Sequence, residues 1–168
     1  YASDQGFFLG EHGWYDKRWM YEESLRFPLV MRWPGKVAAG TVERSLVSGI
    51  DIAPTLCELG CADALPRAQG TSLAPLLQGE PLAAPRDAIY YRYYEYPEPH
   101  RVEPHFGLRT ERHKLLVFPR LGASELFDLE TDPRELDNLA GDPEHAELEA
   151  RLRARLASLQ AEYGDAPR

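Results

Sequence analysis

Apolar residues recur at helical spacing near the end of the chain. Asp142, Pro143 and Glu144 form a helix start, since Asp caps helices well and Pro is tolerated in the first turn. From there the apolar positions lie three or four residues apart: Leu148, Leu152, Leu156, Leu159 and Tyr163. The pattern predicts an amphipathic helix of about five turns with its Arg and Glu residues in water.

Between residues 86 and 129 the pattern changes to short runs rich in aromatic and β-branched residues, separated by turn signals. These runs predict strands at residues 89–96, 105–109, 114–118 and 125–129. Four successive short strands favour an antiparallel sheet.

The first half of the chain has a different pattern of apolar and turn residues. The apolar run 27–33, closed by Pro34 and Gly35, predicts a buried strand followed by a turn. Asp51 predicts a helix start and Gly60 a helix end, and residues 70–79 predict a short helical turn. The apolar face of the first of these helices consists of Ile52, Leu56 and Leu59.

These elements divide the chain into two predicted domains. Residues 1–85 form an α/β part, and residues 86–168 form a subdomain of antiparallel sheet and amphipathic helix. Since polar motif residues follow Tyr1 directly, we expect the chain to be a piece of a larger protein.

Charge and composition narrow the classes of partner. The net charge is −8, with 19 basic and 27 acidic residues, which disfavours nucleic acid because phosphate contacts need clustered Lys and Arg. No apolar run reaches the roughly 18 residues that would span a bilayer. Cys57 and Cys61 match neither a zinc nor a C-x-x-C redox motif, so we expect reduced, partly buried thiols.

The opening segment carries the candidate chemistry. Asp4 and Gln5 are adjacent oxygen donors before Gly6, and a hard cation such as calcium binds such oxygens, although Asp before Gly also occurs in plain turns. Lys17 lies among aromatic residues, where it either meets an anionic substrate or covers the rings with its stem. The residues alone leave both alternatives open.

The string SDQGFFLGEHGWYDKRWMYEESLRFPLVMRWPG resembles the type I sulfatase pattern, in which S-D-[HNQ]-G precedes G-E-H-G, an aromatic residue, a lysine and W-P-G. SGIDIAPTLCELG, GTSL and ELFDLETDPRELDNLA resemble later sulfatase segments. The resemblance implies an α/β fold: the C-terminal part of the sulfatase (alkaline-phosphatase-like) fold, with a small antiparallel sheet and a long C-terminal helix.

The resemblance also implies roles. Asp4 and Gln5 match the last two metal ligands, for Ca²⁺, and Lys17 matches the lysine that contacts sulfate. His12 matches a position near the pocket, with either substrate contact or loop packing as its role. For a shared site, Asp4, Gln5 and Lys17 must converge, so the chain must turn at Gly6 and the 10–13 loop must fold back.

The family's nucleophile is a formylglycine made from the cysteine of a C-x-[PA]-x-R motif, and neither Cys57 nor Cys61 stands in that motif. We therefore expect the nucleophile to lie upstream in the parent enzyme and the chain alone to be inactive. In the parent, hydrated formylglycine would attack sulfur while calcium and cationic side chains neutralise the sulfate oxygens.

Residues 91–110 resemble the C-terminal subdomain of sulfatases that act on sulfated sugars. They make His100 and His105 candidate substrate contacts, although an aromatic strand is also typical of a core. The expected substrate is a sulfated small molecule or glycan; a glycan substrate would favour a periplasmic or secreted enzyme, and otherwise a cytoplasmic one is expected. The alternatives are a phosphonate or phosphodiester hydrolase of the same superfamily and a non-catalytic glycan-binding module.

Overall fold

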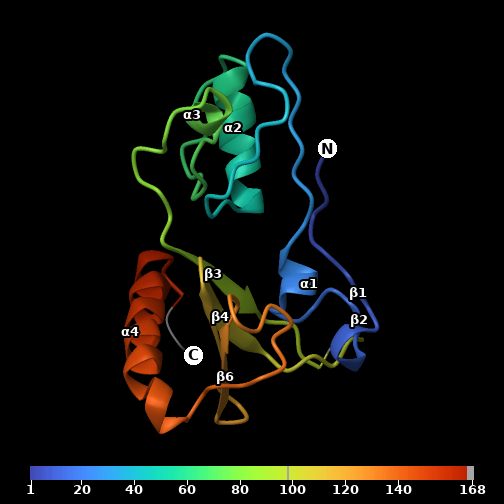
Figure 1. Ribbon diagram of the computed structural model, residues 1–168, viewed down its shortest axis with the longest axis vertical. Coiled ribbons are helices and arrows are strands. Elements are labelled where there is room, and N and C mark those ends of the chain that lie inside the picture. Colours follow the sequence, from blue (N-terminus) through green and yellow to red (C-terminus); the bar gives the residue numbers. More distant parts are fainter. Residues whose placement is uncertain (98, 166–168) are drawn as a thin grey trace. The chain divides into compact units, whose positions relative to one another are not determined.

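An antiparallel sheet of four strands is the largest element of the computed structural model, which describes residues 1–97 and 99–165 (Figure 1). Neighbouring strands pair in chain order, and short turns join β4 to β5 and β5 to β6. The strands are β3 (Ala88–Tyr93), β4 (His105–Thr110), β5 (His113–Phe118) and β6 (Ala123–Asp128). The predicted sheet is confirmed.

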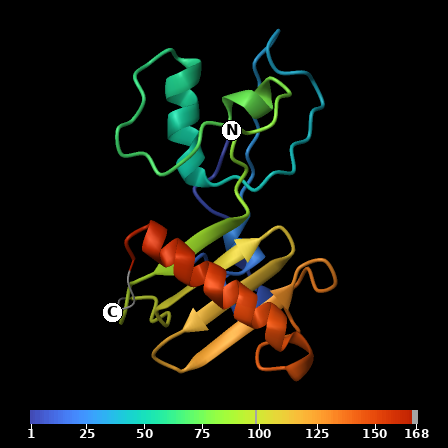
Figure 2. The ribbon, with the colours of Figure 1, turned by 90° about the vertical axis from the view of Figure 1, so that its left-hand side faces the viewer.

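Helix α4 (Ala146–Glu162) lies across one face of this sheet (Figure 2). The 3-10 helix η3 (Pro143–His145) leads into it, and the Asp142 side chain accepts a hydrogen bond from the Glu144 N–H, as the predicted helix start requires. The core beneath α4 consists of Ala88, Leu108, Leu115, Leu126, Leu152, Leu156 and Leu159. The long C-terminal helix is confirmed.

The segment 5–27 covers the opposite face of the sheet (Figure 1). Its Met20 packs with Leu116, Phe118 and Phe127 in a second buried cluster. Because successive strand residues point to opposite faces, Leu115 joins the α4 core while Leu116 joins this cluster. Burial on both faces explains the continuous apolar run 115–118 in β5.

Four short elements make up segment 5–27. They are β1 (Phe8–Leu9), the 3-10 helix η1 (Glu11–Gly13), β2 (Tyr15–Asp16) and α1 (Glu22–Leu25). With the residues from Ala88 onward they form one compact unit, and residues 1–4 and 28–87 form the other. The chain thus changes units after Asp4, after Phe27 and after Asp87. The domain boundary at residue 85 stays a prediction, and segment 5–27 packs with the sheet that follows that boundary.

The other unit contains η2 (Gly49–Asp51), α2 (Ile52–Leu59) and α3 (Ala74–Leu77), which confirms both predicted helical segments. Asp51 is fully buried and binds the Arg86 guanidinium through two 2.8 Å contacts. Its carboxylate also accepts hydrogen bonds from the backbone N–H groups of Ser48 and Thr71. Burial favours the neutral acid, but these donors outweigh it and lower the pKa of Asp51. Besides preceding α2, Asp51 therefore links the segments that contain Ser48, Thr71 and Arg86.

Three sequence predictions in this unit were wrong. Residues 27–33 form no buried strand, because pairing is limited to one Ala2–Leu29 bridge in the part of the chain that is described. Leu56 is 59% exposed, because Thr55 takes the inward position and bonds to the Asp51 carbonyl and the Leu73 N–H. Cys61 is exposed just beyond the helix end; both cysteines are free, as predicted.

Across residues 1–97 and 99–165, no helix has the length and apolar character needed to cross a membrane.

Candidate functional site

The chain bends at Asp4 and Gln5, as the predicted metal turn requires. The Asp4 side chain is exposed and Gln5 is half-buried. The Gly6 N–H donates a 2.8 Å hydrogen bond to the Ser24 carbonyl of α1, and a Cβ on Gly6 would lie 2.0 Å from the Glu23 carbonyl oxygen. Glycine is thus required here by close packing of two backbones rather than by a left-handed conformation.

Strands β1 and β2 form a hairpin that folds the 10–13 loop back, as predicted. Phe8 pairs with Asp16 and Leu9 with Tyr15, and the turn between them uses positive φ at Gly10, His12 and Gly13. Paired Cα atoms lie about 5 Å apart. Lys17 follows β2 directly. Its backbone therefore lies beside the residues that join Gln5 to β1.

Lys17 is half-buried, and its carbonyl accepts a 2.8 Å hydrogen bond from the Ser24 hydroxyl. The backbone on either side of the site is therefore tied to the same α1 residue, which itself has no exposed surface. The convergence of the Asp4, Gln5 and Lys17 side chains on one surface stays a prediction.

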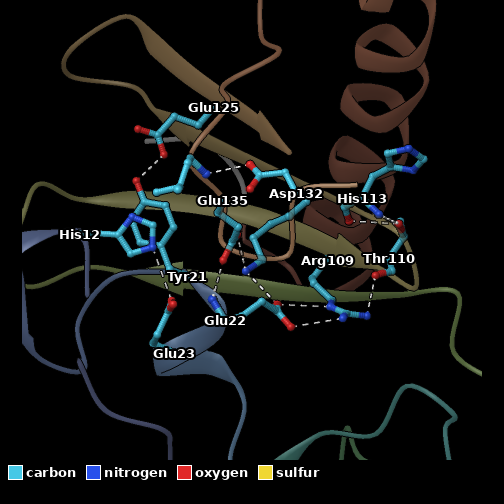
Figure 3. A network of polar contacts seen from close by, with 12 residues as sticks. His12, Tyr21, Glu22, Glu23, Arg109, Thr110, His113, Glu125, Asp132 and Glu135 are labelled. Carbon is cyan, nitrogen blue, oxygen red and sulfur yellow. Dashed lines mark hydrogen bonds and ion pairs between the residues drawn. The ribbon is translucent and has the colours of Figure 1, made fainter. Parts of the chain in front are cut away.

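His12 lies in the hairpin loop with a positive φ of 54°. Its ring stacks on Tyr21 with the ring centres 4.4 Å apart, and its Nε2 lies 3.5 Å from a Glu23 carboxylate oxygen (Figure 3). Burial and a hydrogen bond to Glu125 raise the pKa of Tyr21, so the ring on which His12 stacks is neutral. These contacts fix the ring orientation, and they leave both predicted roles of His12 open.

His100 lies beside the Lys17 segment in a polar cluster with Asp16 and Arg18. Its Nδ1 is 3.0 Å from an Asp16 carboxylate oxygen, and its Nε2 is 3.0 Å from Nη2 of Arg18. Arg18 Nε contacts the same carboxylate at 3.3 Å. The His100 side chain keeps 36% of its surface exposed, so it retains surface for a substrate contact. Asp16 and Arg18 were not among the site residues predicted from the sequence.

His105 is fully buried in an aromatic cluster. Its ring packs on Trp19, Tyr91, Tyr93 and Phe118, and its Nδ1 is 2.8 Å from the Glu103 carbonyl. Burial lowers the pKa of His105 below its ordinary 6.5, so the ring is neutral at pH 7. The structure gives His105 a packing role within this unit.

A buried ion network holds α1 against the sheet, and the sequence analysis missed it. Lys114 has no exposed surface, and its Nζ lies 2.8 Å from Glu22 and 2.7 Å from Glu135. Glu135 also accepts a 2.7 Å hydrogen bond from the Glu22 N–H, and Arg109 pairs with Glu22 at 3.2 Å (Figure 3). Glu22 lies 92 residues before Lys114 and 113 residues before Glu135, so no local spacing could reveal the network.

The pKa values in this network move in opposite directions. Burial raises the pKa of Glu135, and Lys114 only partly offsets that effect. Burial would also raise the pKa of Glu22, but Lys114 and Arg109 together outweigh it and lower that pKa. Glu22 is therefore the firmly ionised partner that α1 presents to the cations.

Asp4 and Gln5 are hard oxygen donors of the kind that calcium prefers, but calcium takes 6–8 oxygens. Within residues 1–97 and 99–165, no group of three or more His, Cys, Asp or Glu residues could hold a metal. The oxygen donors of Asp4 and Gln5 would therefore fit calcium only together with ligands from other residues.

A family model described as N-sulphoglucosamine sulphohydrolase, C-terminal, matches residues 10–162. The chain belongs to the sulfatase family. The match covers β2, α1, the sheet and α4, and the sulfatase family predicted from the sequence is thereby confirmed.

Known relatives agree with this membership. An N-acetylglucosamine-6-O-sulfatase from Bacteroides thetaiotaomicron is 43% identical over 168 residues, which is 98% of this chain and 30% of that protein. A protein solved in complex with its substrate D-glucosamine-2-N,6-O-disulfate has a TM-score of 0.87 and 43% identity, over 98% of this chain and 34% of that one. The phosphonate monoester hydrolase of Agrobacterium radiobacter has a TM-score of 0.83 and 29% identity, over 96% and 34% of the two chains. This sulfatase chain thus spans about a third of the length of its relatives.

Proposed function

We propose that this chain is the C-terminal part of a sulfatase that hydrolyses a sulfate ester on a sulfated sugar. The observation that carries the proposal is that Gly6, beside Gln5, and Lys17 both hydrogen bond to Ser24. The backbone that bears the proposed metal ligand and the backbone that bears the proposed sulfate-binding lysine are therefore held on one residue.

The side chains have distinct proposed roles. Asp4 and Gln5 would hold calcium together with ligands from elsewhere in the protein, and bound calcium would neutralise the sulfate oxygens. The Lys17 ammonium would bind a sulfate oxygen on which charge grows in the transition state. His12, fixed by Tyr21 and Glu23, would border the pocket. No nucleophile motif lies in this chain, so the attacking group would come from outside it.

A sulfated amino sugar is the favoured substrate class. The support is the 43% identity to an N-acetylglucosamine-6-O-sulfatase and to a protein solved with a disulfated glucosamine. His100 is the proposed sugar contact in this chain, because it is exposed and lies next to the Lys17 segment. The buried His105 is not included.

The phosphonate monoester hydrolases are the second candidate, because two of them share the fold at TM-scores of 0.83 and 0.84 with 29% and 27% identity. Their substrates also carry a tetrahedral anionic centre that a metal and a lysine can stabilise. The lower identity makes this reading second to the sulfatase one.

A substrate panel on the full-length protein tests the proposal. We expect turnover of N-acetylglucosamine 6-sulfate with kcat/KM at least about tenfold above that of a phenyl phosphonate monoester, and loss of turnover in EDTA that calcium restores. The reverse preference would establish the phosphonate reading. Activity unaffected by complete metal removal would refute the roles of Asp4 and Gln5.

A further inference from the structure

Ser24 contacts both segments of the candidate site through different atoms. Its hydroxyl donates to the Lys17 carbonyl at 2.8 Å, and its own carbonyl accepts from the Gly6 N–H at 2.8 Å. The residue has no exposed surface, so neither bond competes with water. Ser24 therefore contacts Lys17 through its side chain and Gly6 through its main chain.

The packing around Ser24 leaves little freedom. A Cβ on Gly6 would lie 2.0 Å from the Glu23 carbonyl oxygen and 2.4 Å from that of Arg26, so the turn lies directly on the α1 backbone. α1 is in turn held to the sheet, because the Glu22 N–H donates to Glu135 and the Glu22 carboxylate binds Lys114. Movement of the Lys17 carbonyl away from α1 thus requires the Ser24 hydroxyl bond to break.

We infer that Ser24 is a positioning residue for Lys17. Its hydroxyl fixes the Lys17 backbone relative to the Gln5–Gly6 turn, which would align the ammonium with the sulfate group of the substrate. The inference rests on the proposed function and deepens it, since it assigns the alignment of the lysine to one hydroxyl. Misplacement of a catalytic group by about 1 Å can cost on the order of 100-fold in rate.

Because the Ser24 hydroxyl and carbonyl bind different segments, removal of the hydroxyl should affect Lys17 and leave the contact with Gly6 unchanged. Ser24→Ala removes the bond to the Lys17 carbonyl and keeps the carbonyl that receives the Gly6 N–H. The variant should therefore lose turnover while the calcium concentration for half-maximal activity stays unchanged.

A double-mutant cycle in the full-length protein tests the inference, using Ser24→Ala, Lys17→Ala and the double variant. We expect Ser24→Ala to lower kcat by about 10- to 100-fold with little change in KM, and to cause no further loss when Lys17 is already alanine. Thr110→Ala is the matched control, because its hydroxyl also bonds to the main chain, with half-buried His113 at the β4–β5 turn. That control should unfold more easily at unchanged kcat.

The outcomes separate the inference from the proposed function. Equal losses from Ser24→Ala in both Lys17 backgrounds, wild-type kcat in Ser24→Ala, or a raised calcium requirement would each overturn the positioning role alone. Wild-type kinetics in Lys17→Ala would overturn both. If Ser24→Ala does not fold, Ser24→Cys keeps the volume and a weak donor, and its intermediate kcat loss must likewise vanish in the Lys17→Ala background.

Discussion

Lys17 lies between two fixed points, the β1–β2 hairpin before it and the Ser24 bond to its carbonyl. Since that bond uses the main chain, removal of the side chain leaves it intact. Lys17→Ala in the full-length protein should therefore fold normally and lose about 10²- to 10³-fold in kcat/KM, the effect of removing one preorganised transition-state partner.

Lys36→Ala is the control for this prediction, since Lys36 is exposed in the other unit. Steady-state kinetics with a sulfated sugar and a thermal melt of each variant provide the measurements. Kinetics as fast as those of the control would show that Lys17 is a surface lysine that covers aromatic rings.

Because His105 is buried in its neutral form, we expect the folded protein to be less stable in acid. Its folded pKa is lowered from 6.5, so the unfolded chain binds more protons below about that pH, and the free energy of unfolding should fall as the pH drops from 7.5 to 5. His113, whose pKa burial also lowers, adds in the same direction.

His105→Phe should reduce this pH dependence, because phenylalanine fills the aromatic cluster without titrating. Urea unfolding of both proteins at pH 7.5 and pH 5 measures the slope, and His145→Phe, at the partly buried end of η3, serves as the control. An undiminished slope in His105→Phe would place the acid sensitivity in other groups.

At the level of secondary-structure elements, the attachment of α1 to the sheet depends on the Lys114 ammonium. Lys114→Met would leave Glu22 and Glu135 buried without that cation, and removing one partner of a buried ion pair costs about 3–5 kcal/mol. Chemical denaturation should show a loss of that size. Arg112→Met, which breaks an exposed pair with Asp128, should cost much less; equal losses would mean that the network contributes no more than a surface pair.

Helix α4 depends instead on apolar burial. Leu156 is 3% exposed in the core beneath the helix, so Leu156→Ala should destabilise the protein by about 2–5 kcal/mol. Leu121 is 65% exposed in the β5–β6 turn, and its alanine variant should stay close to wild type. Comparable denaturation midpoints for the two variants would contradict the assigned packing of α4.

At the scale of the whole molecule, we expect no hydrolysis by this chain alone. The 168 residues contain no C-x-[PA]-x-R cysteine and only two of the proposed metal ligands. Purified chain should therefore release no product from a chromogenic aryl sulfate above a heat-treated control, whereas the full-length protein should. Turnover by the isolated chain would mean that a nucleophile within it had been overlooked.

The sheet and α4 were predictable because their signals are local. A leucine stripe at spacings of three and four reports the face of a helix wherever it packs, and turn residues between short apolar runs mark successive hairpins. The Asp4, Gln5 and Lys17 motif was likewise visible in order along the chain, as was the bend just before Gly6. These features depend on residues that are close together in the chain. A single sequence shows such local relations directly.

Tertiary structure alone decided the features that depend on distant partners. Residues 27–33 are as apolar as a buried strand, yet they are largely unpaired because a strand is defined by its neighbours. The sequence placed Lys114 only at the start of a predicted strand, and the fold put Glu22 and Glu135 beside it. Ser24 carried no local sign of its role, since contact with Gly6 and Lys17 arises only when three segments pack together. Sequence by itself determined the local elements and the candidate motif, and long-range packing decided which polar groups hold that motif in place.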